Sequence, residues 1–249
     1  MFRPLCTLLL VLTAVSVRGQ DAPPPPPLSG SVEGKFYLSP TGQFKVTIPV
    51  LPELGGDISD TANVVTFQDD FNVHVTIAAF PQDATQRWEL STRGLKDYLI
   101  YFFSNYVFAD FARNFEGAEI ESAKFVPAML EGALVTNLLI PGGSMFADRI
   151  ANLGTTDRVA VAKRGNLLFV RNNPIFVVST ELAERVIEGL AYKKTTTEED
   201  DALLQKLNDI VGKMQLVRQP ATSSAAATPA GSPTITVPTV TPPASADKK

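Results

Sequence analysis

Apolar and polar side chains alternate in several short stretches of the chain, a pattern typical of β-strands with one buried face. Residues 43–48 and residues 71–80 both alternate in this way. Turn-forming residues at 39–42 and at 69–70 separate each stretch from an earlier apolar run, so two hairpins are predicted. Later strands are predicted at residues 119–128, 132–140, 158–163 and 167–171, with a turn at 164–166.

Two longer stretches follow the period of an α-helix. A broad apolar arc predicts one helix over residues 92–114, and a narrower stripe with an acidic start predicts another over residues 197–214. Residues 174–190 are compatible with a short strand at 175–178 and a helix at 181–189. Hairpins, a long helix, more hairpins and a closing helix predict an α+β fold, in which helices pack on an antiparallel β-sheet.

The two ends of the 249-residue chain lack these patterns. Residues 1–19 contain an apolar stretch too short to span a bilayer, which predicts a cleaved signal peptide; an uncleaved N-terminal anchor is the alternative. A Pro-rich linker is predicted at 20–34, the globular domain at 35–217 and a disordered Ala/Thr/Pro-rich tail at 218–249. We therefore expect a secreted or periplasmic protein with no transmembrane span after signal cleavage.

The charge and the cysteine content indicate what the protein binds and by which route it is exported. The net charge is −4 and Lys and Arg form no long block, so nucleic-acid binding is not expected. The only cysteine, Cys6, lies in the predicted signal peptide, so the mature chain would have no thiol. This favours bacterial export over a eukaryotic secretory route. No cofactor or metal motif is present in the sequence.

Few residues are candidates for chemistry. His74 is the only histidine and is expected on the solvated, polar face of its strand. Aspartates at 57, 60, 69 and 70 match no EF-hand spacing and are expected to be ordinary turn and hairpin residues. Glu119 and Glu121 are expected to be surface charges.

Two features suggest a binding surface. Gly142, Gly143 and Ser144 lie in a loop predicted at 141–156, which fits neither a P-loop nor a nucleophile elbow but could line a cleft. Tyr101 and Phe108 lie on the polar arc of the predicted helix, seven residues apart, and are a candidate partner-binding face. The alternative is that another segment of the chain covers these two rings.

Residues 37–49 are similar to the start of PsbP-like domains, where a short hairpin ends in an aromatic strand and an Ile/Val-Pro step. The strand order, the mid-chain helix, Glu131-Gly132 and the closing helix at 207–214 extend the resemblance to residues 35–217. It implies an α/β/α sandwich and a role in binding proteins. The family includes extrinsic lumenal proteins of photosystem II, and its fold is shared with a Ran-binding nuclear import factor. Neither function transfers, because no matching partner-binding motif is present.

Together these observations predict a non-catalytic extracytoplasmic binding or accessory protein, with another envelope or secreted protein as partner. The alternative is an extracytoplasmic hydrolase that uses carboxylates and loop serines. The lack of cysteine and the single histidine weaken this alternative, because they remove common acid–base and nucleophilic groups. A deep pocket with converging carboxylates would favour the enzyme, and an exposed apolar patch would favour the binding protein.

Overall fold

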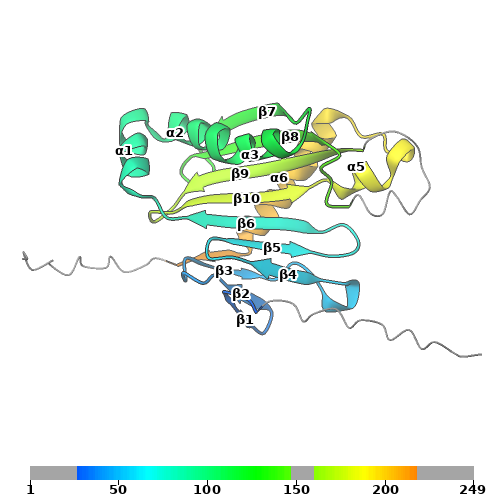
Figure 1. The fold of residues 1–249 in the computed structure, drawn as a ribbon, viewed down its shortest axis with the longest axis horizontal. Coiled ribbons are helices and arrows are strands. Elements are labelled where there is room, and N and C mark those ends of the chain that lie inside the picture. Colours follow the sequence, from blue (N-terminus) through cyan, green and yellow to red (C-terminus); the bar gives the residue numbers. More distant parts are fainter. Residues whose placement is uncertain (1–26, 147–159, 218–249) are drawn as a thin grey trace, which may run out of the picture.

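Two antiparallel sheets form the body of the protein in the computed structural model, which describes residues 27–146 and 160–217 (Figure 1). The larger sheet has seven strands in the order β4-β5-β6-β10-β9-β8-β7. Along the chain these are β4 (Asp57–Asp60), β5 (Val64–Gln68), β6 (His74–Phe80), β7 (Glu119–Val126), β8 (Ala133–Pro141), β9 (Val161–Val170) and β10 (Ile175–Glu181). The smaller sheet contains β1 (Ser31–Glu33), β2 (Phe36–Leu38), β3 (Phe44–Thr47) and β11 (Met214–Leu216).

Helices and the smaller sheet cover opposite faces of the larger sheet. A helical layer lies on one face and consists of α1 (Ala84–Arg93), α2 (Leu95–Phe102), the π-helix η2 (Phe103–Phe108) and α3 (Ala109–Asn114). The long helix α6 (Thr196–Gly212) packs on the other face together with the smaller sheet. Short helices occur at η1 (Pro52–Leu54), α5 (Ala183–Ile187) and η3 (Gly189–Ala191). The predicted α+β fold, an antiparallel sheet with helices packed on it, is confirmed.

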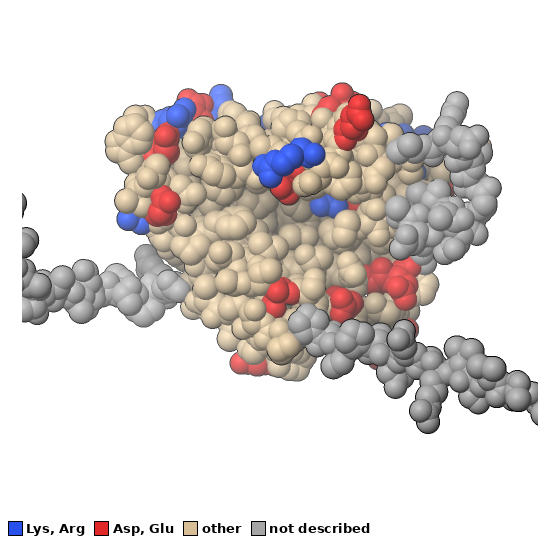
Figure 2. Space-filling model, viewed as in Figure 1, with Lys and Arg blue, Asp and Glu red and all other residues tan. Residues whose placement is uncertain are grey.

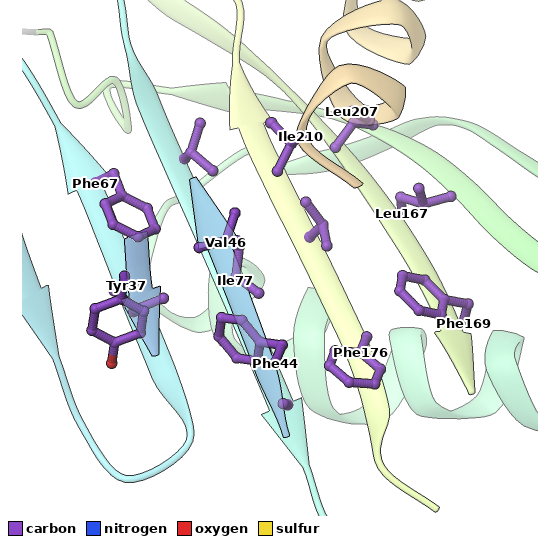
Figure 3. Close-up of a cluster of buried hydrophobic side chains, with 14 of the residues drawn as sticks. Tyr37, Phe44, Val46, Phe67, Ile77, Leu167, Phe169, Phe176, Leu207 and Ile210 are labelled. Carbon is purple, nitrogen blue, oxygen red and sulfur yellow. The ribbon is translucent and has the colours of Figure 1, made fainter. Parts of the chain in front are cut away.

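This arrangement creates two apolar cores. One fills the space between the larger sheet and the layer formed by α6 and the smaller sheet, where Tyr37 and Phe44 meet Phe67 and Phe176 (Figure 3). The other lies under the helical layer. Strands between two cores bury both faces, so β9 and β10 are buried along nearly their whole length.

The predicted helix over residues 92–114 is instead a chain of four helical segments. It starts earlier, at Ala84, where the Asp83 side chain accepts a hydrogen bond from the Gln86 N–H. Gly94 has φ 77° and ends α1, because this backbone conformation suits glycine and cannot continue an α-helix. By contrast, the closing helix α6 agrees with the prediction and begins with a capping box formed by Thr195 and Glu198.

The predicted turn at residues 164–166 is wrong, because β9 runs without a break through these residues. Gly165 pairs with Thr180 on one side and with Asn137 on the other. A Cβ atom on Gly165 would lie 3.1 Å from Leu203 and 3.3 Å from Leu207 in α6. The glycine therefore allows helix and strand to approach closely, which is a packing role rather than a turn role.

The predicted signal peptide (1–19) and the predicted tail (218–249) lie outside the described residues, as do residues 20–26 of the predicted linker. The residues that follow include β1, a strand the sequence pattern did not predict, which pairs with β2. Among the helices in the described part of the chain, none is long and apolar enough to cross a membrane.

Candidate functional site

A row of small polar side chains crosses the larger sheet on the face that carries the helical layer. It consists of Ser59, Thr66, Thr76, Ser179, Asn166 and Thr136, each opposite the next on the neighbouring strand. We call this set the polar row. Hydrogen bonds join Thr66 to Thr76 at 3.3 Å, Ser179 to Asn166 at 2.8 Å and Asn166 to Thr136 at 3.3 Å.

The polar row runs from solvent to the interior. Ser59 is exposed, Thr66 and Thr76 are half-buried, and Ser179 and Asn166 are buried. The helices lie over β7, β8 and β9, and α2 also reaches one end of β6, where the Phe80 ring centre lies 6.1 Å from that of Phe102; β4 lies beyond the helical layer (Figure 1). Figure 2 shows that this face is hollowed below the helices and that a basic side chain lies in the hollow. The small side chains of the row leave room on the sheet where larger ones would fill it.

A second row, next to the first, carries charged groups. Arg164 pairs with Glu181 across β9 and β10, and the neighbouring pair of Thr180 with Val75 places His74 next along β6, on the same face of the sheet. The Arg164 Nη2 donates to Glu181 Oε2 at 3.3 Å, and the Arg164 guanidinium carbon lies 5.1 Å from the centre of the Phe111 ring. We call His74, Glu181 and Arg164 the charged row.

The predicted loop supplies the remaining contacts of Glu181. The Ser144 hydroxyl donates to Glu181 Oε1 at 2.6 Å, and the Met145 N–H donates to Oε2 at 3.2 Å. Gly142 has φ 68°, and a Cβ on Gly143 would come within 2.2 Å of Ile140, so both glycines are needed for the path of the loop. The structure thus brings Ser144 to the charged row, whereas residues 147–156 of the predicted loop lie outside the described residues.

Two nitrogen atoms of the charged row have no hydrogen-bond partner within the described residues: His74 Nδ1 and Arg164 Nε. Both side chains are buried, with 2% of His74 and 7% of Arg164 exposed. Burial, helped by the positive charge of Arg164, lowers the pKa of His74 to about 3, so its imidazole is neutral at physiological pH. Buried polar atoms without partners are uncommon in folded proteins and require an explanation.

The expectation that His74 is solvated is therefore wrong, although its face was correctly identified as polar. Strand β6 lies inside the sheet, between β5 and β10, so a side chain on its polar face is enclosed by neighbouring strands. The alternation of one strand indicates which face a residue occupies, but it does not show what lies beside that strand.

Tyr101 and Phe108 are placed in different surroundings. The Tyr101 ring meets the Tyr106 ring edge-on, with centres 6.1 Å apart, and lies 4.5 Å from the Arg93 guanidinium. Phe108 stacks on the buried Phe103 at 6.4 Å and packs against the core. The π-helix between the two positions has wider turns than an α-helix, so a spacing of seven residues no longer places them side by side.

Tyr106, which the sequence pattern had assigned to the buried arc, is the exposed ring of this region. It is 52% exposed and its centre lies 5.0 Å from that of Phe102. Trp88, on the neighbouring helix α1, is 62% exposed. We call Trp88, Tyr101 and Tyr106 the aromatic face.

On the other face of β9, Lys163 is the centre of a buried ionic network. Its Nζ lies 2.5 Å from Glu121, 2.6 Å from Asp200 and 3.0 Å from Glu199, and Arg185 also pairs with Glu199 at 2.6 Å. Burial acts to lower the pKa of Lys163, but the three carboxylates outweigh it and raise the pKa. Glu121 is thus part of the network rather than the free surface charge that was expected.

The predicted turn aspartates serve the backbone. Asp69 Oδ1 accepts hydrogen bonds from the N–H groups of residues 71, 72 and 73. Asp60 accepts bonds from the N–H groups of Ser29 and Gly30 and from the Tyr37 hydroxyl. In the described residues, no group of three or more His, Cys, Asp or Glu side chains is arranged to hold a metal ion.

Comparisons with known proteins relate the chain to others only through its fold. No protein-family model matches, and no curated protein matches in sequence. The solution structure of cyanobacterial PsbP (CyanoP) from Synechocystis sp. PCC 6803 is 15% identical, covers 76% of this chain and 98% of its own, and has a TM-score of 0.43. The Saccharomyces cerevisiae Ran-binding protein Mog1p is 11% identical, covers 75% and 97%, and has a TM-score of 0.41.

A crystal structure from Bacteroides thetaiotaomicron is 12% identical, covers 76% of this chain and 50% of its own, and has a TM-score of 0.38. The resemblance to PsbP-like domains that residues 35–217 suggested is confirmed as a weak resemblance of fold.

Proposed function

We propose that this protein is an exported, non-catalytic binding or accessory protein that attaches to another envelope or secreted protein through its aromatic face. The observation that carries the proposal is the exposure of large rings in a helical layer: Trp88 is 62% and Tyr106 is 52% exposed. Tryptophan and tyrosine are the residues that most often dominate the binding energy of protein interfaces. The predicted signal peptide and the lack of a thiol in the mature chain support an extracytoplasmic location.

The local structure holds the tyrosine rings in place before any partner arrives. Tyr106 rests against Phe102 and against the edge of Tyr101, which in turn lies on Arg93. A ring that is already fixed loses little conformational entropy when it is buried in an interface. The π-helix that presents Tyr106 is also a type of segment found frequently at functional sites.

The arrangement of the carboxylates also favours a non-catalytic role. Glu121, Glu199 and Asp200 converge, but they converge on Lys163, which is 0% exposed. Carboxylates that flank a scissile bond must face a space that admits substrate. These three instead neutralise a buried ammonium group.

Affinity capture from the native envelope fraction tests this function. The mature chain, a Trp88→Ala/Tyr106→Ala variant and a Leu190→Ala control would be immobilised in parallel. Leu190 is 87% exposed on η3, so the control removes an equally accessible apolar side chain from another part of the surface. We expect the mature chain and the control to retain one specific protein and the double variant to lose at least about 90% of it, since hot-spot residues carry most of the affinity.

Retention of the same protein by the double variant would contradict the proposal. Circular dichroism and urea unfolding check that the double variant is folded. Exposed residues away from special backbone features change stability by about 0.5 kcal/mol or less, so its unfolding free energy should stay close to that of the mature chain.

One contact favours hydrolysis as a second function. The Ser144 hydroxyl donates to Glu181 at 2.6 Å, the geometry of a serine next to a carboxylate base. Glu181 is, however, also engaged by Arg164 and by the Met145 N–H. A Ser144→Ala variant separates the two functions. If the purified mature chain hydrolyses an ester or peptide and the Ser144→Ala variant does not, the protein is a hydrolase. If both proteins show only the background rate of hydrolysis, the hydrolase function is excluded.

A further inference from the structure

A ligand that pairs with the unpartnered atoms of the charged row must be able both to donate and to accept hydrogen bonds. Within residues 27–146 and 160–217, Arg164 Nε–H is a donor without an acceptor, and His74 Nδ1 on a neutral imidazole has no partner. Neutral imidazole has one donor and one acceptor nitrogen, so Nδ1 is one or the other. A hydroxyl group satisfies Nδ1 in either case, because hydroxyls donate and accept, whereas a carboxylate only accepts.

The charge balance of the row also favours a neutral ligand. Arg164 and Glu181 form an ion pair, and His74 adds no charge at physiological pH. An anion bound at Arg164 would have to share one guanidinium with Glu181, whose side chain is 0% exposed. Burying a second carboxylate beside the first carries a large desolvation and repulsion cost.

The polar row extends this chemistry away from the charged row. Thr66 and Thr76 are half-buried hydroxyl residues at the open end, and Ser179 lies between them and Arg164. These groups lie opposite one another in register on one face of β5, β6 and β10. Hydroxyl groups on a ligand and on the sheet can exchange donor and acceptor roles along the whole row.

We propose that the polar row and the charged row together form a binding site for a neutral polyhydroxylated ligand, of the chemical class of a monosaccharide or a glycan end. One ligand hydroxyl accepts from Arg164 Nε–H, and another bonds to His74 Nδ1. The rest of the ring lies over Thr76 and Ser179. The site is separate from the aromatic face and does not depend on it.

The single histidine makes a direct test possible. Because His74 is the only histidine, its imidazole signals in an NMR spectrum of the mature chain belong to one residue. D-glucose, D-galactose and N-acetylglucosamine would each be titrated to about 100 mM, a range that detects even millimolar affinities. D-glucuronate, which has the ring of glucose and a carboxylate, is the charged comparison.

We expect at least one neutral sugar to shift the His74 signals in a saturable way and to bind more tightly than glucuronate. Arg164→Gln should weaken this binding at least about tenfold, because a buried donor is lost. Arg171→Gln is the matched control: Arg171 follows the end of the same strand and pairs with Glu131 at the surface. If Arg164→Gln does not fold, Ser179→Ala replaces it, with a smaller expected loss of affinity.

Two results would overturn the proposal. If no sugar produces a saturable shift, the two nitrogens are satisfied by water alone. If glucuronate binds more tightly than every neutral sugar, the site selects a carboxylate and the charge argument fails. Neither result bears on partner capture through Trp88 and Tyr106.

Discussion

Lys163 and Arg164 are adjacent in β9, are both buried, and face opposite sides of the sheet, yet their surroundings differ. Lys163 has three carboxylates within 3.0 Å. Among the described residues, Arg164 has one, at 3.3 Å, and its Nε, like His74 Nδ1, has no hydrogen-bond partner. The first cation is fully compensated by the protein, and the second is compensated only in part.

This difference suggests that the buried charge of Lys163 stabilises the fold, whereas the buried charge of Arg164 serves binding. A buried ion pair is tolerated when its neighbours satisfy every donor and acceptor. Around Lys163, the ammonium group lies within 3.0 Å of three carboxylates from β7 and α6, and these ion pairs connect the helix to the sheet. Around Arg164, the described residues leave Nε without a hydrogen-bond partner, as they do for His74 Nδ1. A folded protein that carries this cost is expected to recover it by binding.

The largest expected effect comes from removing the two cations in turn. Lys163→Met leaves Glu121 and Asp200 without their counter-charge and leaves Glu199 with Arg185 alone, which should lower the free energy of unfolding by about 3–5 kcal/mol. Arg164→Met should cost less, about 1–3 kcal/mol, because Glu181 keeps the Ser144 hydroxyl and the Met145 N–H. Urea unfolding of both variants measures the gap. Equal losses would remove the distinction between the two regions.

A smaller effect is expected from pH. The pKa of His74 is lowered to about 3 in the folded state, below its ordinary value of 6.5, so the unfolded chain binds more protons between these values. Stability therefore falls as pH drops below about 6.5, and this residue accounts for about 2 kcal/mol between pH 7 and pH 5.

A His74→Asn variant serves as the reference for that loss, since other groups titrate in both proteins and cancel in the difference. The pH dependence of unfolding should be about 2 kcal/mol shallower in the variant over this range. An imidazole NMR titration with a midpoint near 6.5 in the folded protein would show that His74 is not enclosed as described.

The smallest expected effect is the coupling energy between Arg164 and the Phe111 ring that lies beside it. The Arg164 guanidinium carbon lies 5.1 Å from the Phe111 ring centre, a cation–π contact that Lys163 does not make with any ring in the described part of the chain. Phe111→Leu keeps an apolar side chain but removes the aromatic ring. A double-mutant cycle with Arg164→Met should give a coupling energy of about 0.5–1 kcal/mol, and the same cycle with Lys163→Met should give none. Equal couplings would mean that Phe111 acts through general packing.

The elements that could be predicted from the sequence are those with one buried face and with clear turn or capping residues at their ends. The hairpins around residues 39–42 and 69–70 alternate cleanly, and α6 has both an apolar stripe and the Thr195 cap. Strand β9 was divided in two, because Gly165 between polar residues resembles a turn. The glycine is there to admit α6, a requirement of tertiary packing that no local pattern records.

The candidate site was harder to predict, because its parts come from strands far apart in the chain. Ser144 was identified through its glycine-rich loop and His74 through its uniqueness, but neither pointed to Arg164 or Glu181. One signal was available: Lys163 and Arg164 stand inside an otherwise apolar run. Charged residues in such a run indicate burial with partners. The π-helix, which exposes Tyr106 in place of the predicted Phe108, left no comparable signal.

The most direct test of the binding role assigned to the Arg164 side of β9 is a crystal structure of the mature protein soaked in the neutral sugar that gives the strongest NMR response. The account predicts sugar density over Thr76 and Ser179, with hydroxyl oxygens within hydrogen-bond distance of Arg164 Nε and His74 Nδ1. Ordered water at both nitrogens, or sugar bound only at another surface, would contradict it.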